Sequence, residues 1–139
     1  MPIEERISAS GHEFVLAEHA STFEVTTDDY LTKAGDCILG IEADRAPADF
    51  DAEFVAAASD ASATITATFR ADGRAVSITG RGDPRLTFEN ERSMVGRTSE
   101  YVDDRTIMVE ADAAAADLDR EFVAALANGA DLTVVLRVE

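Results

Sequence analysis

The sequence predicts a mainly β fold with two helices, of the α+β class, in which residues 1–70 and 71–139 form two similar halves. Three observations support this prediction. One long segment occurs twice, apolar residues alternate along strand-like stretches outside it, and each copy carries an apolar stripe of helical period. Each half is expected to run strand, strand, strand, helix, strand. Since strands outnumber helices, we expect a β-sandwich or a closed barrel flanked by two helices.

The repeated segment aligns without a gap. IEADRAPADFDAEFVAAAS at residues 41–59 matches VEADAAAADLDREFVAALA at residues 109–127, with twelve identities between positions 42 and 58. Five of these are alanines, which an alanine-rich chain matches by chance. The other seven are Glu42, Asp44, Asp49, Asp51, Glu53, Phe54 and Val55. These seven indicate an internal duplication.

Shorter matches extend the alignment outward. TITATFR (64–70) parallels LTVVLR (132–137), SASGH (8–12) parallels SITGR (77–81), and one Thr-Phe-Glu (22–24) parallels the other (87–89). This alignment sets His12 against Arg81, Asp36 against Asp104, and Cys37 against Arg105. No linker rich in Pro, Gly or Ser separates the halves, so we expect one domain over residues 1–139 with a shared core about a pseudo-two-fold axis.

The strand assignments come from apolar alternation. Phe23 and Val25, and likewise Ile65, Ala67 and Phe69, alternate with polar residues as in half-buried strands. The run from Cys37 to Ile41 is continuously apolar and is expected to form a strand buried on both faces.

Each helix should begin at an aspartate and present one apolar stripe. The stripes are Phe50, Phe54 and Ala58 in one copy, and Leu118, Phe122 and Leu126 in the other. The candidate N-caps are Asp49 or Asp51, and Asp117 or Asp119. Asn128-Gly129 predicts a helix end, and Asp72-Gly73 predicts a two-residue hairpin turn.

The charge balance is strongly acidic. Twelve basic and 28 acidic residues give a net charge of −16, and Lys33 is the only lysine. Carboxylates scattered over the whole chain favour a halophilic, cytoplasmic protein over one with a single cation-binding patch. No stretch is long and apolar enough to predict a membrane span or a secretory signal. Cys37 is the only cysteine, so neither an internal disulfide nor a thiolate cluster is predicted.

Residues that differ between the halves are better site candidates than residues that both halves share. The shared acids Glu42, Asp44, Glu110 and Asp112 could bind a metal, but acids between a strand and a helix more often cap amides, so no metal site is predicted. The candidate ligand-binding residues are His12, His19, Asp36, Cys37, Arg81 and Arg105. The two histidines could bind a metal, transfer protons or contact a phosphate, or have a structural role. Cys37 could be a nucleophile or an inert thiol among apolar neighbours.

Five arginines lie within residues 80–105 and offer a local anion-binding patch in an acidic chain: Arg81, Arg85, Arg92, Arg97 and Arg105. The alternative is that they pair with the acids between them. GRGDP at residues 80–84 is not a phosphate loop, because it lacks the following Lys-Ser/Thr and the helix.

Several segments together resemble the archaeal domain-of-unknown-function family 371. These are residues 11–44, the glycine and proline of GRGDP, and residues 104–120, and the resemblance covers nearly the whole chain. It implies a small β-sandwich-like domain and names no activity. The recurring polar residues that it implies are His12, His19, Thr22, Glu24, Asp36, Cys37 and Arg105. Relatives often carry a basic residue before Gly35, where this chain has Ala34.

Four functions are compatible with these features. The favoured hypothesis is a binding module that holds a small anionic or phosphate-bearing ligand where the halves meet. The second is a small enzyme with a histidine as general base and Asp36 or Cys37 as its partner. The third is a purely interacting protein, such as an oligomer formed through exposed strand edges or the helix stripe. The fourth, nucleic-acid binding, is disfavoured because the arginine-bearing half has few aromatic residues. The sequence names no cofactor.

Overall fold

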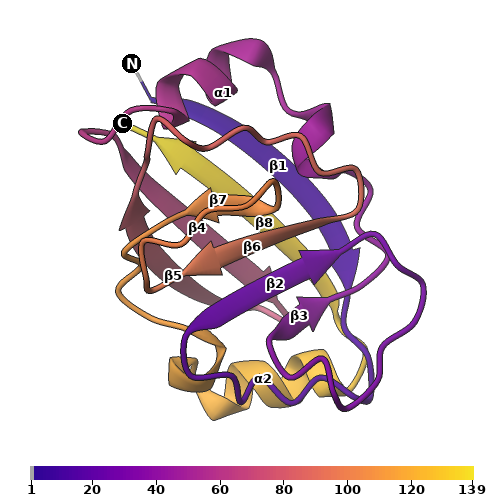
Figure 1. Cartoon of the computed structure of the whole chain (residues 1–139). Helices are drawn as coiled ribbons and strands as arrows, with labels where there is room; N and C mark the ends of the chain where they lie inside the picture. Colours follow the sequence, from indigo (N-terminus) through magenta and orange to yellow (C-terminus); the bar gives the residue numbers. More distant parts are fainter. Residues whose placement is uncertain (1) are drawn as a thin grey trace.

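Eight strands form two four-stranded sheets in the computed structural model, which describes residues 2–139 (Figure 1). The first sheet is antiparallel, with the order β1 (Ile3–Ser10), β8 (Asp131–Val138), β4 (Thr64–Ala71), β5 (Arg74–Arg81). The second sheet has the order β3 (Ile38–Gly40), β2 (Thr22–Thr26), β6 (Ser93–Arg97), β7 (Thr106–Met108). In it β2 and β6 are antiparallel, while β3 runs parallel to β2 and β7 parallel to β6. The predicted mainly β fold with two helices is confirmed.

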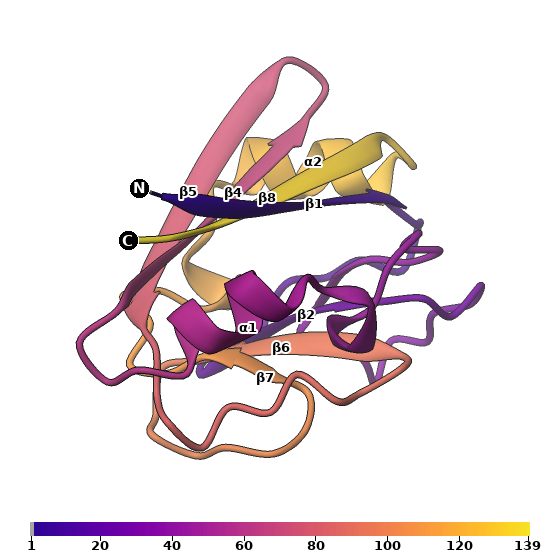
Figure 2. The same cartoon turned by 90° about the horizontal axis from the view of Figure 1, so that it is seen from above.

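The two sheets face each other as separate layers with the apolar core between them (Figure 2). Alternation along the strands directs one side of each sheet inward, so that Phe23 of β2 meets Phe69 of β4 edge to face at 5.3 Å. Buried side chains from both sheets and both helices belong to one cluster. This core fixes which side chains of each sheet remain on the outer face.

The two helices cover opposite ends of the layered strands (Figure 1). Helix α1 (Ala52–Ala58) buries Phe54 and Ala58, and α2 (Arg120–Ala127) buries Phe122 and Leu126. A single 3₁₀ turn precedes each helix, at Pro47–Asp49 and Ala115–Asp117.

The helix-end and turn predictions can be resolved. Asp51 and Asp119 are the N-caps, whereas Asp49 and Asp117 accept hydrogen bonds from amides that begin the preceding 3₁₀ turns. The helix end at Asn128-Gly129 is confirmed, as is the Asp72-Gly73 turn between β4 and β5.

Of the two alternatives for the sheets, the closed barrel is excluded: within residues 2–139 only isolated bridges, Ser10 to Ile41 and Arg81 to Val109, extend the ladders between them. Each ladder stops there because the next residue, Glu42 or Glu110, turns the chain with a positive φ. The run from Cys37 to Ile41 is also not a central strand. It gives only the short β3 at a sheet edge, where Cys37 and Ile38 are partly exposed.

Local geometry recurs at fixed separations along the chain. Before β3 and β7 the matching residues lie 71 positions apart, as with the positive φ of Ala17 and Phe88. After that point the separation is 68, as with Glu42 and Glu110. Hydrogen bonds follow the same rule: the amides of Ser8 and Thr79 donate to the carboxylates of Asp44 and Asp112. These two acids thus accept from amides of β1 and β5 and do not cap a helix.

This geometry corrects part of the sequence alignment. The Nδ1 atom of His12 accepts from the amide two residues on, as the carboxylate of Asp83 does, so His12 corresponds to Asp83 and not to Arg81. Strand β2 likewise corresponds to β6, and the second Thr-Phe-Glu (87–89) lies in the segment before β6. The match of Cys37 with Arg105 is retained. Cys37 lies three residues before the last residue of β3, and Arg105 lies three residues before the last residue of β7.

A close backbone approach at each helix yields a stability prediction. A Cβ atom on Gly82 would overlap the carbonyl oxygen of Ala58, and one on Gly11 would overlap that of Leu126. We expect Gly82→Ala to lower the free energy of unfolding by about 3 kcal/mol, since backbone atoms must move to relieve the overlap. Urea unfolding at constant salt measures the change.

The control is Gly73→Ala, where a Cβ meets nothing within 4 Å but φ is +73°. It should cost only about 1–2 kcal/mol, from the left-handed backbone alone. Equal destabilisation by the two variants would contradict the packing described here.

Candidate functional site

The candidate site lies on the outer face of the second sheet, where its two central strands pair. Along β2, Phe23 and Val25 point into the core, which places Glu24 on the opposite face. Glu24 pairs with Val95 of β6, and these two residues also correspond to each other in the two halves. The pairing of β2 with β6, called the seam below, is therefore where the halves meet in this sheet.

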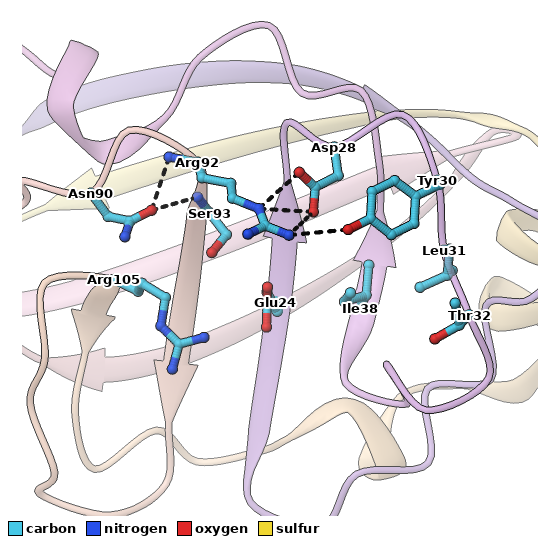
Figure 3. A pocket seen from close by; sticks show the side chains of 10 residues that line it. All are labelled: Glu24, Asp28, Tyr30, Leu31, Thr32, Ile38, Asn90, Arg92, Ser93 and Arg105. Atoms are coloured by element: carbon cyan, nitrogen blue, oxygen red, sulfur yellow. Dashed lines mark hydrogen bonds and ion pairs between the residues drawn. The ribbon is translucent and has the colours of Figure 1, made fainter.

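A cavity of about 270 Å³ opens beside the seam and is called the seam pocket (Figure 3). Its lining comes from residues 24–38 of the first half and 90–105 of the second. The lining residues are Glu24, Asp28, Tyr30, Leu31, Thr32, Ile38, Asn90, Arg92, Ser93 and Arg105. Antiparallel pairing of β2 with β6 brings these two stretches together although they are distant in sequence.

Two arginines line the seam pocket, and each is held along one edge by an aspartate. Arg92 donates through Nε and Nη2 to Asp28, at 2.8 and 2.7 Å, and its Nη2 also reaches the hydroxyl of Tyr30 at 3.3 Å. Arg105 donates through Nε and Nη2 to Asp103, the shorter bond being 3.0 Å. Within residues 2–139 the Nη1 atoms of both arginines donate no hydrogen bond.

These pairings fix the ionisation of the groups around the pocket. The hydrogen bond from Arg92 holds the pKa of Asp28 below its ordinary value, and the same bond raises the pKa of Arg92. Both guanidinium groups remain accessible, with side-chain exposures of 63% for Arg92 and 41% for Arg105. The pocket therefore presents two oriented cations to solvent.

Glu24 is the carboxylate of the pocket that lacks a cationic partner. No arginine, lysine or histidine nitrogen of residues 2–139 lies within 4 Å of it, and its side chain accepts only from the thiol of Cys37, at 3.4 Å. Burial, and then the charge of Glu24, raise the pKa of Cys37 to about 11. At neutral pH Cys37 is thus a protonated hydrogen-bond donor and a poor nucleophile.

His19 has a structural role at the start of β2. Its Nδ1 accepts from the hydroxyl of Thr22 at 2.9 Å and from the amides of Ser21 and Thr22. Asn90 makes the same two amide contacts in the second half, with Arg92 and Ser93. The amide of His19 also donates to the carbonyl oxygen of Asp36. The histidine therefore caps the chain before β2, and its Nδ1 is already occupied.

The structure thus brings together only part of the predicted site. Arg105 lines the pocket, Cys37 contacts the lining residue Glu24, and His19 and Asp36 meet through their backbones. His12 bonds locally to the amide of Phe14 and does not line the pocket. Arg81 is engaged by Glu110, Asp83 and Glu100. Its pairing leaves no guanidinium for the seam pocket.

Sequence reasoning did not single out most of the pocket residues. Asp28, Tyr30, Asn90 and Ser93 were missed, Arg92 was only one of five arginines, and Glu24 entered through the family resemblance alone. The correct match of β2 to β6 is the signal that would have singled out Glu24, because it shows that Glu24 and Val95 differ across the seam.

In the second half, the place that matches the seam pocket is filled by Arg97. Its Nε donates to the hydroxyl of Thr106 at 2.9 Å, its Nη2 donates to Asp103 at 3.0 Å, and its guanidinium lies 4.8 Å from the centre of the Tyr101 ring. The residue that matches Arg97 is Thr26, which is uncharged, buried and not part of the pocket lining. The two matching places therefore differ in that only the second half has a guanidinium of its own there.

The fold and site define a class: a mainly β protein with two facing sheets and a small polar pocket beside the seam, on the outer face of the second sheet. Residues 7–139 match the family described as Domain of unknown function (DUF371), and the chain belongs to it. An uncharacterized protein of the archaeon Methanocaldococcus jannaschii is 39% identical over 126 residues, which covers 91% of this chain and 93% of the relative. No helix within residues 2–139 has the length and apolar character needed to cross a membrane.

The environment of Cys37 predicts an unusual pH profile for its alkylation. Reaction with iodoacetamide should keep accelerating from pH 7 to pH 10, because only the thiolate reacts and the thiol pKa lies near 11. Glu24→Gln removes the neighbouring charge and should shift the profile to lower pH. Mass spectrometry of the alkylated chain gives the rates.

The unfolded protein in urea is the control, with a profile near the ordinary thiol pKa of about 8.5. A folded protein whose alkylation rate levels off at that pH would contradict the contact between Cys37 and Glu24.

Proposed function

We propose that this protein binds a small anionic or phosphate-bearing ligand in the seam pocket, where the two halves meet. The observation that carries the proposal is the pair Arg92 and Arg105, which line one cavity with their Nη1 groups unbonded within residues 2–139. Guanidinium groups bind phosphate and carboxylate oxygens through paired N–H donors.

The local positive charge of the two arginines supports anion binding in the seam pocket. A chain of net charge −16 repels anions on average, so anion binding needs local, oriented cations. Asp28 and Asp103 each hold one edge of a guanidinium and so restrict its rotation before a ligand arrives. Preorganised donors bind a ligand more tightly, because less side-chain freedom is lost on binding.

The size of the cavity supports a small molecule. About 270 Å³ is near the lower end of the range for pockets that hold metabolite-sized ligands. The lining also supplies neutral polar groups, from Asn90, Ser93 and Thr32, which can fix the orientation of a ligand.

We further propose that the chain is one domain that arose by duplication of a unit of about 70 residues. The recurring φ angles, aspartate caps and isolated bridges support this origin, as does the order of strands in each sheet. In each sheet, the two outer strands occupy the same place in the two halves of the chain, and so do the two inner strands. On this view, the seam pocket is a place where the two copies have diverged.

The scattered carboxylates support a further proposal, that the protein works in a cytoplasm rich in salt. Surface charges are strongly screened under such conditions, so the anion must be bound by direct guanidinium contacts and not by long-range attraction.

The enzymatic alternative is weaker. Cys37 is protonated at neutral pH and donates to Glu24, and the Nδ1 atom of His19 is held by Thr22. Asp36 meets His19 only through its backbone. These contacts explain all three residues without a reaction.

Replacing Arg105 tests the proposed function. In calorimetric titrations with potassium phosphate at fixed chloride, Arg105→Gln should weaken binding at least about tenfold, since it removes a charged donor of about 1.5–3 kcal/mol. The matched control is Arg74→Gln. Arg74 lies on β5, is paired with Glu121 of α2 and is not part of the pocket lining. Unchanged binding by Arg105→Gln, or equal losses in both variants, would overturn the proposal.

A further inference from the structure

We propose that the ligand of the seam pocket is zwitterionic, with its anionic group on Arg92 and Arg105 and a cationic group on Glu24. This inference rests on the proposed function and adds the chemical class of the ligand. It starts from Glu24, a carboxylate in the pocket lining that has no cationic partner within residues 2–139.

The carboxylates around the pocket differ in their hydrogen-bond and ion-pair partners. Asp28 is paired with Arg92, and Asp103 is paired with both Arg97 and Arg105. Glu24 accepts only the weak thiol donor of Cys37. A carboxylate in this position repels a ligand that is only anionic, but it favours one that also brings an ammonium or guanidinium group.

The arrangement of the lining allows both contacts at once. Figure 3 shows Glu24 between Arg105 on one side and Ile38 on the other, with Arg92 reaching across toward Asp28 and Tyr30. The lining carries two arginines and two carboxylates, Glu24 and Asp28, so a cationic group on the ligand offsets part of the negative charge that its anionic group brings. The pocket therefore has complementary regions for both ends of a small zwitterion.

The second half gives an independent reason to place a cation here. In the matching space the protein puts its own guanidinium, that of Arg97, against Tyr101 and Thr106. The corresponding groups in the first half are Tyr30 and Ile38 in the pocket lining. Since Thr26 carries no charge where the second half has Arg97, a cationic group of the ligand can supply the missing charge beside Tyr30 and Ile38.

Two ligands that share a phosphate separate this inference from the proposed function. O-Phosphoethanolamine carries an ammonium group, and ethyl phosphate has nearly the same size without it. Calorimetry at pH 7.5 and fixed chloride should show O-phosphoethanolamine binding at least about fivefold more tightly to the unmodified protein. In Glu24→Gln this preference should disappear, and ethyl phosphate should bind at least as well as before.

Each result has one meaning. If both ligands bind equally to the unmodified protein, and Arg105→Gln weakens both, the anion site stands and the zwitterion inference is overturned. A preference that persists unchanged in Glu24→Gln also overturns it. If neither ligand binds, both proposals fall. Because the comparison of ligands uses the unmodified protein, it remains decisive even if Glu24→Gln folds poorly.

Discussion

The antiparallel pairing of β2 with β6 is the contact on which the other features of this protein depend. It joins the two halves through backbone hydrogen bonds and sets Glu24 directly opposite Val95. The same pairing directs Phe23, Val25 and Met94 into the core, where Phe23 meets Phe69 of the other sheet. Since side chains alternate across a strand, burying these residues fixes Glu24 on the outer face. One register therefore determines both the core and the site.

Matching positions in the two halves carry different side chains at the seam. In the second half, Arg97 bonds to Asp103 and Thr106 and packs on Tyr101, with only 11% of its side chain exposed. In the first half, the matching residue is the uncharged, buried Thr26, and Arg92 and Arg105 of the second half line the seam pocket. On the proposed duplication, one copy of the unit kept a structural contact where the other gained a pocket.

Much of the fold follows from local sequence signals. The repeated segment was visible in the sequence, in Glu42 to Val55 and their matches. Asp51 and Asp119 cap the helices, and Asp72-Gly73 forms its hairpin turn, as the sequence predicted. These features are predictable because caps and tight turns depend on a few neighbouring residues. The place of residues 37–41 in the sheet did not follow from local sequence signals. An apolar run predicts burial, but which strands lie beside it is decided by the whole sheet, and β3 is an edge strand.

The site was harder to predict for a related reason. The spacing between matched residues changes from 71 to 68 before β3 and β7, and the identical Thr-Phe-Glu segments favoured a false match in the stretch where the strands are short. That error hid the relation of Glu24 to Val95, and the separate match of SASGH (8–12) with SITGR (77–81) set His12 against Arg81. Arg105 was found because its match to Cys37 lies after the change in spacing. Tyr30 and Asn90 line the pocket only through contacts between distant segments, which no local pattern records.

The central claim is that the pocket is one-sided: an anion enters beside Glu24 and not in the matching space beside Val95. An NMR titration of the isotopically labelled protein with phosphate tests it most directly, because each half reports through its own amides. The account predicts that shifts concentrate at residues 26–32, 90–93 and 105 and saturate together. Equal shifts at residues 19–22 and 97–101, or shifts spread evenly over the surface, would contradict it.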